Sequence, residues 1–397
     1  MSTAEQKTLD NNILDKKKAC LTLNAGSSTL KFALFEPFID TLKRRYSGLI
    51  DYGLGTAQLR LYNAAGETIH SANLEKKTGA AEQAIDCIET MLPDIQISTV
   101  SHRLVHGGQQ FFDAIQIDAE NLDQLKALTP LAPLHLPAEI RAIEALLKRL
   151  PGIPQVAYFD TAFHRNISDL AKMLPLPRSF FDEGIIRYGF HGLSYEYITS
   201  ILPVNHGLTI VAHLGSGASA CAIKDGKSVA HSMGFSTNEG LMMSKRSGSI
   251  DPGVVLYLLE EKNYSIADVH SILFDQSGLL GVSGISGDIR ELESSCAEEA
   301  QFAIDFFCYR TAAEISKLLP ALGGINRLVF TAGIGENSAL VRQKICAYLQ
   351  WLGLTIDDEA NRQHASIIST TDSRVTVQVI ATDEESVLAS KAQAFTL

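Results

Sequence analysis

Two short stretches rich in glycine and serine have the composition of phosphate-binding turns. Residues 21–32 and 211–222 each consist of an apolar run, a Gly/Ser turn and a second apolar run. Glycine lets the backbone approach a ligand closely, and consecutive turn amides can form a concave site for phosphate oxygens. Because such turns also occur in ordinary hairpins, one copy alone indicates little. The two copies together predict a duplicated domain that holds one phosphorylated ligand from two sides.

A third glycine turn, at residues 330–337, follows the apolar run 327–330 and precedes a helical pattern at 338–352. A glycine turn between a strand and a helix is a common nucleotide site. Residues 226–228 lack the earlier glycine of a P-loop, and residues 333–335 lack the third glycine of the dinucleotide motif. The phosphate hypothesis therefore depends on the duplication.

The elements that must position these turns occur in a repeated order. The first half has strand patterns at 20–35, 58–62, 68–72 and 154–159, and helical periodicity at 80–91 and 137–150. The second half has a hairpin at 209–223, a strand at 227–233, helices near 254–261 and 297–319, and a strand at 328–330. This order predicts two packed α/β domains with an internal duplication.

Composition restricts the function further. The chain has 397 residues, 46% of them hydrophobic and 20% charged, which are values of a globular protein of about two domains. A net charge of −11 argues against a DNA- or RNA-binding protein. Residues 1–18 are polar, without the apolar centre of a secretory signal, and no apolar run approaches the ~20 residues that span a bilayer. We expect a soluble, cytoplasmic protein that binds neither nucleic acid nor membrane.

The six cysteines, at positions 20, 87, 221, 296, 308 and 346, include no close pair of the zinc-knuckle or redox type. We expect most of them to be buried, inert thiols, and we expect no structural metal.

Six motifs resemble the acetate kinase family in the same order and at similar spacing. They are residues 24–32, 102–108, 132–135, 159–164, 187–192 and the turn at 333, and the resemblance runs from Leu21 to Ala389. That family belongs to the acetate and sugar kinase, Hsp70 and actin superfamily. The resemblance implies a duplicated ribonuclease-H-like (actin-like ATPase) α/β fold, with two domains around a nucleotide cleft. We expect an acceptor-side domain at 1–160, completed by a C-terminal helix at 385–397, and a nucleotide-binding and dimerisation domain at 161–384.

The resemblance implies a phosphotransferase that moves the γ-phosphoryl of ATP reversibly to acetate, giving ADP and acetyl phosphate. The expected metal is Mg²⁺, with Mn²⁺ as an alternative. Such chemistry needs an in-line path and cations around the phosphoryl group, with little covalent help. Related enzymes form homodimers through the second domain, and the resemblance implies the same assembly here.

Four residues are expected by resemblance to carry the chemistry. Arg103 would hold the acceptor carboxylate, for which its planar fork is suited. Arg246 would stabilise charge on the transferring group, and His191 would donate to its oxygens. Asp160 would orient metal-bound water, because acetate has no proton to lose at neutral pH. The alternatives are a surface arginine, a partner of Asp251, a core histidine and a general base, respectively.

Asn24 and Glu384 match the magnesium positions of the family, and Lys31 would reach a phosphate. Mg²⁺ takes few protein oxygens and keeps several waters, which suits such a pair. Two alternatives remain open: Glu384 could stabilise the dipole of a last helix, and Lys31 could be a solvent-facing strand residue.

The remaining expected contacts also come from the resemblance. The phosphates would lie at His213, Leu214, Gly215, Ser216 and Gly217, the base or ribose near Asp288, Ile289 and Arg290, and the adenosine over Gly333, Ile334, Gly335, Glu336 and Asn337. The substrate methyl would lie among Val105, Leu134, Phe190 and Thr237. Residues 278–287, with glycine at every third position, are expected to form a mobile loop.

Four positions depart from the family pattern: Leu136 and Ser216 replace Asn, Ser249 replaces Asp, and Thr237 replaces Pro. They leave open a kinase for propionate, butyrate or another short acid. A binding protein that uses nucleotide as a switch, as actin and Hsp70 do, is the third hypothesis. It would leave Arg103, Arg246 and His191 unexplained.

Overall fold

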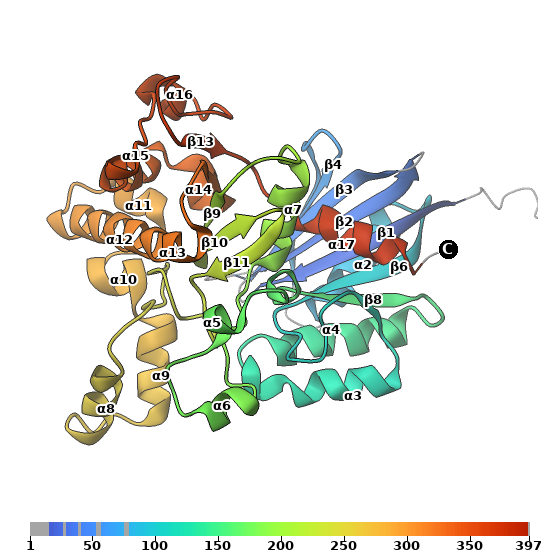
Figure 1. The fold of residues 1–397 in the computed structure, drawn as a ribbon. Coiled ribbons are helices and arrows are strands. Elements are labelled where there is room, and N and C mark those ends of the chain that lie inside the picture. The colour runs from blue at the N-terminus through green and yellow to red at the C-terminus, as the bar shows by residue number, and fades with distance from the viewer. Residues whose placement is uncertain (1–15, 27–28, 39–40, 53–56, 75–78, 396–397) are drawn as a thin grey trace, which may run out of the picture. The chain divides into compact units, whose positions relative to one another are not determined.

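The computed structural model describes residues 16–26, 29–38, 41–52, 57–74 and 79–395 (Figure 1). Ser27 and Ser28 of the first Gly/Ser turn lie outside the described residues. The chain forms two compact units, one from residues 1–162 and 383–397 and the other from residues 163–382, here called unit 1 and unit 2. Within the described ranges, no helix has the length and apolar character needed to cross a membrane.

Unit 1 is built on an eight-stranded mixed sheet in the order β5-β4-β3-β2-β1-β6-β8-β7. Strands β1 to β5 pair as antiparallel neighbours, whereas β6 runs parallel to β1 and β8 parallel to β6. The strands are β1 Lys17–Ala25, β2 Thr29–Phe38, β3 Thr41–Asp51, β4 Ala57–Asn63, β5 Thr68–Leu74, β6 Ile95–Leu104, β7 Ile115–Gln116 and β8 Gln155–Phe159. Because β1, β6 and β8 are parallel, their carboxyl ends lie at one edge of the sheet.

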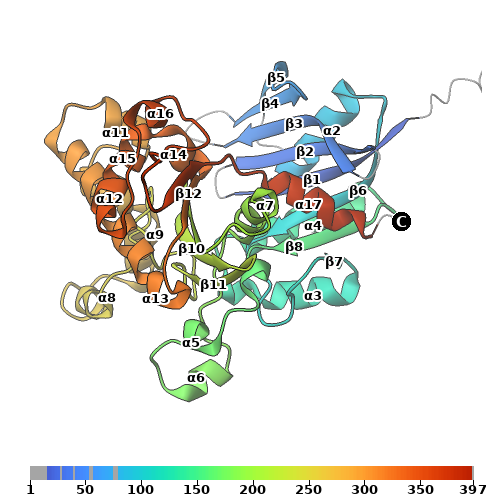
Figure 2. The same cartoon turned by 45° about the horizontal axis from the view of Figure 1, so that its top comes forward.

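Helices cover both faces of this sheet (Figures 1 and 2). Alternating residues of β1 point to opposite faces, as the pleat requires. Leu21 and Leu23 belong to a core completed by α2 (Ala80–Met91) and by Leu146 of α4 (Leu136–Arg149). Cys20 belongs to a second core, completed by the C-terminal helix α17 (Glu384–Gln393). Helix α3 (Ala119–Ala127) and a 3-10 turn at Thr129–Leu131 precede α4.

Unit 2 repeats the central pattern of unit 1. Its five-stranded sheet has the order β11-β10-β9-β12-β13, with antiparallel pairs β9–β10 and β10–β11 and parallel pairs β9–β12 and β12–β13. The order β3-β2-β1-β6-β8 in unit 1 has the same pairing directions. The strands are β9 Thr209–Leu214, β10 Ala218–Lys224, β11 Lys227–His231, β12 Arg327–Thr331 and β13 Thr376–Val379. The predicted α/β fold with an internal duplication is therefore confirmed.

Helix α7 (Gly192–Ile201) packs its apolar side chains on the β9, β10 and β12 part of this sheet. Helices α12 (Glu298–Lys317) and α13 (Leu319–Leu322) approach β10 from the side away from α7 (Figure 2). The other helices of unit 2 are α5 Asp169–Lys172, α6 Arg178–Asp182, α8 Pro252–Glu260, α9 Ile266–Asp275, α10 Gly278–Ser283, α11 Ile289–Ser294, α14 Ala332–Asn337, α15 Ala339–Tyr348 and α16 Asp358–Arg362, with 3-10 turns at Ala162–His164 and Gln350–Leu352.

Three features differ from the expectations. The sequence pattern does not predict β3, a polar strand in which Gly48 makes room for the ring of Phe32 on β2. The loop expected at 278–287 is wrong over its first half, because α10 occupies Gly278–Ser283. Backbone N–H groups of Leu279 and Leu280 donate to the carbonyls of Met243 and Ser244, and this tertiary pairing orders a glycine-rich segment. The third glycine turn, expected at residues 330–337, forms the short helix α14 from Ala332 onward.

Candidate active site

The end of the unit 1 sheet brings Arg103 and Asp160 together. Arg103 is the penultimate residue of β6, and Asp160 directly follows β8, the parallel neighbour of β6. The guanidinium grips the carboxylate with two bonds, Nε to Oδ1 at 3.0 Å and Nη2 to Oδ2 at 2.5 Å. Nη1 donates to the carbonyl of Ala25, at the end of β1, at 3.2 Å. The predicted acceptor clamp and the predicted catalytic aspartate therefore form one bidentate pair, in which the aspartate is buried and the arginine is partly buried.

A second buried carboxylate, Glu139, faces the same arginine. Its Oε2 accepts the backbone N–H of Val105 at 3.0 Å, and its Oε1 lies 3.9 Å from Nη1 of Arg103. Burial, the largest cause, together with the charge of Asp160, raises the pKa of Glu139 to about 7 against the opposing effects of Arg103 and the Val105 bond. Arg103 is already neutralised by Asp160, so burial prevails.

Sequence reasoning missed Glu139. The signal was available, because Glu139 lies on the apolar stripe of α4 with Leu136, Ile140 and Ile143, all of them buried. A carboxylate on the buried face of an amphipathic helix is unusual unless it has a partner.

The two predicted magnesium positions are in direct contact. Asn24, at the end of β1, donates through Nδ2 to Oε2 of Glu384 at 2.7 Å and to Oε1 of Glu385 at 3.4 Å. Glu384 is the first residue of α17, whose N-cap Asp383 accepts the N–H of Ser386. Glu384 therefore also stands where a helix dipole favours an acid.

The electrostatics of this pair suit a hard cation. Burial, and next the charges of Asp160 and Glu385, raise the pKa of Glu384 to about 7. Several carboxylates that share one site repel each other, and a divalent ion with oxygen ligands relieves that repulsion. Lys31 is the register partner of Asn24 on β2, and its side chain is exposed. In the described part of the chain, no group of three or more His, Cys, Asp or Glu side chains forms a metal cage. Any ion here would depend on few protein ligands.

In unit 2, two cationic or donor side chains approach one point of the β9–β10 turn. A Cβ atom placed on Gly217 would lie 3.1 Å from Nη2 of Arg246 and 3.3 Å from Nε2 of His191. A Cβ atom at this position would be crowded by both groups, which glycine avoids. The guanidinium is held from behind, because its Nη1 donates to the carbonyl of Thr237 at 2.6 Å. The turn, Arg246 and His191 thus lie close together within unit 2.

His191 occupies an unusual backbone conformation. It has φ of 57°, in the left-handed region, where it serves as the N-cap of α7. Such a conformation costs on the order of 1 kcal/mol and is kept only where the surroundings enforce it. Its ring stacks on that of His213 with centroids 4.2 Å apart, and its Nδ1 lies 2.7 Å from Oγ of Ser219.

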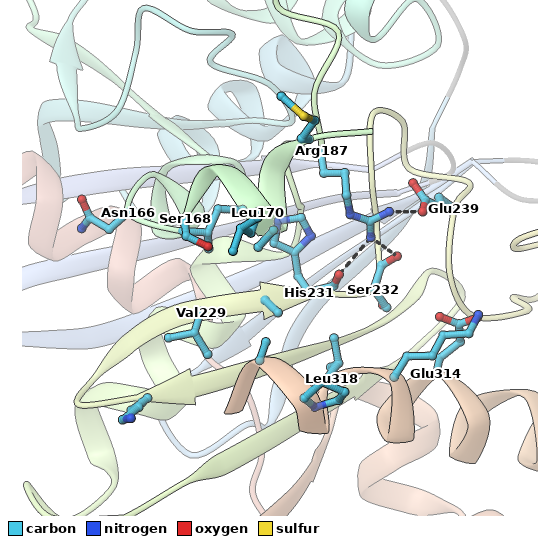
Figure 3. Close-up of a pocket in the computed structure, with 18 of the residues that line it drawn as sticks. Asn166, Ser168, Leu170, Arg187, Val229, His231, Ser232, Glu239, Glu314 and Leu318 are labelled. Carbon is cyan, nitrogen blue, oxygen red and sulfur yellow. Dashed lines mark hydrogen bonds and ion pairs between the residues drawn. The ribbon is translucent and has the colours of Figure 1, made fainter. Parts of the chain in front are cut away.

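The segment that delivers His191 is anchored at both ends, and Figure 3 shows the contacts of Arg187 at its start. Arg187 forms an ion pair with Glu239 and donates to the carbonyls of His231 and Ser232 at 3.0 and 3.1 Å. Nε2 of His164 donates to the carbonyl of Phe190 at 3.0 Å. Arg187 also lines a pocket of about 780 Å³ with Leu170, Val229 and Leu318 among others. Among the described residues, none of the predicted catalytic side chains lines this pocket. The hydrogen bonds of Arg187 and His164 therefore serve to hold the backbone that carries His191, rather than to build a binding site.

The residues expected around the substrate methyl differ in exposure. Val105 of unit 1 and Phe190 of unit 2 are buried, Leu134 is 50% exposed, and Thr237 is half-buried. The expected nucleotide residues begin at the β9–β10 turn, where the N–H of Gly215 donates to the carbonyl of Gly217 and the carbonyl of Ser216 accepts the N–H of Ser244.

Two further segments that are expected to contact the nucleotide lie in or at the start of short helices. Asp288 caps α11 and pairs with Arg290, whose bond lowers the pKa of that carboxyl; the Arg290 side chain is 85% exposed. Gly333 to Asn337 lie in α14. A Cβ on Gly333 would meet nothing within 4 Å, whereas Gly335 packs on Phe330. The outer side of α14 is therefore open at Gly333.

The other departures from the family pattern have structural roles. Leu136 starts α4 in the core, and Oγ of Ser249 accepts the N–H of Gly240 at 2.9 Å. Neither replacement changes the charged residues around Arg103 and Asp160 or those around Arg246 and His191.

Known proteins resemble this chain over nearly its whole length. The Acetokinase family model matches residues 19–390. The acetate kinase of Rhodopseudomonas palustris is 44% identical over 384 residues, which cover 93% of this chain and 96% of that protein. The crystal structure of Porphyromonas gingivalis acetate kinase is 35% identical, with a TM-score of 0.83 over 96% of this chain and 100% of its own. A propionate kinase from Francisella tularensis is 34% identical, with a TM-score of 0.85 over 94% and 98%. The resemblance predicted from the motifs is confirmed, and the chain belongs to the acetokinase family.

Proposed function

We propose that this protein phosphorylates acetate with ATP, reversibly, to give acetyl phosphate and ADP by direct in-line transfer. The observation that carries the proposal is the approach of Arg246 and His191 to one point of a glycine turn. Phosphoryl transfer needs fixed donors around the charge that develops on the moving group, and this cluster supplies a permanent cation and a neutral or charged donor side by side.

Unit 1 is proposed to bind the acceptor. Arg103 has five N–H donors, of which Asp160 and Ala25 take three. The remaining two N–H groups can donate to the acetate carboxylate. Asp160 then acts mainly by holding the guanidinium plane, and a role for it near the metal is compatible with its influence on Glu384.

Unit 2 is proposed to bind the nucleotide. The turn formed by His213, Leu214, Gly215, Ser216 and Gly217 would hold the phosphates, with Arg246 and His191 donating to the transferring group. Asp288, Ile289 and Arg290 would lie near the base or ribose, and α14 would support the adenosine beside the open surface at Gly333. Lys31, whose side chain is exposed, would bind a phosphate.

Asn24 and Glu384 would hold Mg²⁺, or Mn²⁺, directly or through water. When bound, the ion would neutralise phosphate charge. The protein contributes the side-chain oxygens of these two residues. The carboxylate of Glu384 is repelled by the neighbouring acids Asp160 and Glu385, and a cation would relieve that repulsion.

Propionate is the second candidate acceptor. The neighbour from Francisella tularensis named as a propionate kinase supports it, as does Thr237 in place of the family proline. A pocket wall discriminates against one extra methylene by only about 1 to 3 kcal/mol. We therefore propose acetate as the best acceptor, with propionate used as well.

A homodimer formed through unit 2 is also proposed. Large apolar side chains are exposed on three helices of this unit: Val254, Leu256 and Tyr257 on α8, Ile266 on α9, and Phe302 and Tyr309 on α12. Exposed apolar surface of this kind is typical of protein interfaces. Sedimentation of the wild type and of Leu256→Glu and Phe302→Glu variants tests it: wild type at twice the chain mass, with dissociation of at least one variant, is expected. A monomeric wild type contradicts the proposal.

The activity is tested by incubating the protein with ATP, Mg²⁺ and acetate, trapping acyl phosphate with hydroxylamine, and measuring ADP in parallel. Equal amounts of acetyl hydroxamate and ADP are expected. ADP release that does not depend on acetate would refute the kinase and favour the nucleotide-switch hypothesis.

A further inference from the structure

His191 and its neighbour His213 are each held at Nδ1 by a chain of two hydroxyl groups. Oγ of Ser219 lies 2.7 Å from Nδ1 of His191 and also hydrogen-bonds the hydroxyl of Tyr195. Oγ of Ser194 lies 2.8 Å from Nδ1 of His213 and accepts the hydroxyl of Thr382 at 2.9 Å. All of these groups belong to unit 2.

The two chains come from different elements that meet at one place. Tyr195 lies one turn after His191 on α7, and Ser219 lies on β10 directly opposite His213 of β9. Tyr195 and Ser219 are buried, so water does not compete for these bonds. The stacked rings present their other nitrogens to the turn: a Cβ on Gly217 would lie 3.3 Å from Nε2 of His191, and one on Gly215 would lie 3.9 Å from Nε2 of His213.

The direction of the bonds follows from the donors available. A serine hydroxyl has one hydrogen, and Ser219 Oγ has two partners among the described residues. A phenol, with an ordinary pKa near 10, is a much better donor than an alkyl alcohol. Tyr195 therefore donates to Ser219, and that bond polarises the serine hydroxyl so that it donates more strongly in turn. With Tyr195 as the donor, the serine hydrogen is available to Nδ1 of His191, and the ring hydrogen of His191 then lies on Nε2.

We propose that Tyr195 and Ser219 are positioning residues that hold His191 as the Nε2–H tautomer, aimed at the transferring phosphoryl group beside Arg246. The proposal deepens the proposed function and rests on it for the identity of that group. The two hydroxyl groups make the neutral imidazole of His191 a fixed donor, while Arg246 supplies the permanent charge. The parallel chain through Ser194 sets the same tautomer for His213.

The tautomers are measurable by ¹⁵N NMR of the full-length protein labelled at histidine, with His191→Gln and His213→Gln spectra used for assignment. In the wild type, both residues are expected to show an acceptor-type Nδ1 and a protonated Nε2. Tyr195→Phe and Ser219→Ala are expected to average the two nitrogen signals of His191 and leave those of His213 in place. The matched control Ser194→Ala, which removes the hydroxyl next to Tyr195, is expected to do the reverse.

Turnover provides the second measurement. Loss of one fixed donor commonly costs on the order of 10²-fold or more in rate, and a donor that is only misoriented costs less. We expect Tyr195→Phe and Ser219→Ala to lower kcat about 10- to 100-fold, with KM for ATP and acetate within about twofold of wild type. Tyr195→Phe removes a single oxygen, so its fold is expected to be kept even if Ser219→Ala is less stable.

A wild-type His191 protonated at Nδ1, or a Tyr195→Phe protein with unchanged His191 signals and unchanged kcat, overturns the proposal. The tautomer is read without substrate. If acetyl phosphate were not formed, the proposed function would fail while the NMR result on the hydroxyl chains still stood or fell by itself.

Discussion

Replacing Glu139 by Gln tests whether burial outweighs ion pairing beside Arg103. The amide keeps an oxygen for the N–H of Val105, which Glu139 accepts at 3.0 Å, and removes the charge 3.9 Å from Nη1 of Arg103. If Arg103 stabilised the carboxylate strongly, the variant would lose stability. Because Asp160 already occupies the fork of Arg103, we expect a gain at high pH instead.

The magnitude follows from the pKa. Burial raises the pKa of Glu139 from 4.5 to about 7 in the folded protein. Between these values the native state binds more protons than the unfolded chain, so the contribution of Glu139 to stability is present below pH 4.5 and is lost as the pH rises through 7. A shift of about 2.5 units corresponds to about 3 kcal/mol. Gln carries no such penalty, so the advantage of the variant should be small near pH 5, under about 1 kcal/mol, and should reach about 3 kcal/mol at pH 8.

Thermal unfolding of both proteins from pH 5 to 8 measures this difference, and a stability gain of that size corresponds to about 6 to 12 °C for a unit of this length. The control is Glu144→Gln on the same helix, where an exposed carboxylate lies 2.9 Å from Lys126. Solvent screens an exposed pair of this kind, so Glu144→Gln should differ little in stability from wild type. A gap between Glu139→Gln and wild type that stays constant with pH, or that favours wild type at pH 8, would show that Arg103 outweighs burial.

Four further results are expected. Arg246→Lys should lose most turnover while ATP still binds, because a point charge cannot replace two directed bonds; a variant with more than half the wild-type kcat contradicts this. Arg103→Ala should raise KM for acetate at least tenfold more than KM for ATP, and equal rises would indicate a structural role. Glu384→Ala should raise the Mg²⁺ requirement, whereas Glu385→Ala should act mainly on the melting temperature; a wild-type Mg²⁺ titration for Glu384→Ala favours the helix-dipole reading. Thr237→Pro should shift the kcat/KM ratio of acetate to propionate, because it removes a backbone N–H and reshapes the wall; an unmoved ratio places Thr237 away from the acceptor.

Local patterns were enough to predict the repeated part of the fold. The antiparallel pairs β1–β2 and β9–β10, the helices α2 and α4, and the start of α17 after Asp383 follow from alternation, helical periodicity and capping. The polar strand β3 and the glycine-rich helix α10 do not, because their backbone hydrogen bonds go to segments that their own composition does not specify.

The sequence by itself determined the family and the residue types of the site, because long motifs around Arg103, His191 and the glycine turns identify them. Tertiary structure alone decided which side chains touch. The carboxylate partners of Arg103 are 36 and 57 residues away, and those of Asn24 are 360 and 361 residues away. Ser219 on β10 meets His191 at the start of α7. Burial in the folded protein sets the pKa of Glu139, and the packing of α7 on β10 brings the hydroxyl of Ser219 to His191. Neither can be deduced from the residue type alone, because both depend on segments that are distant in the sequence.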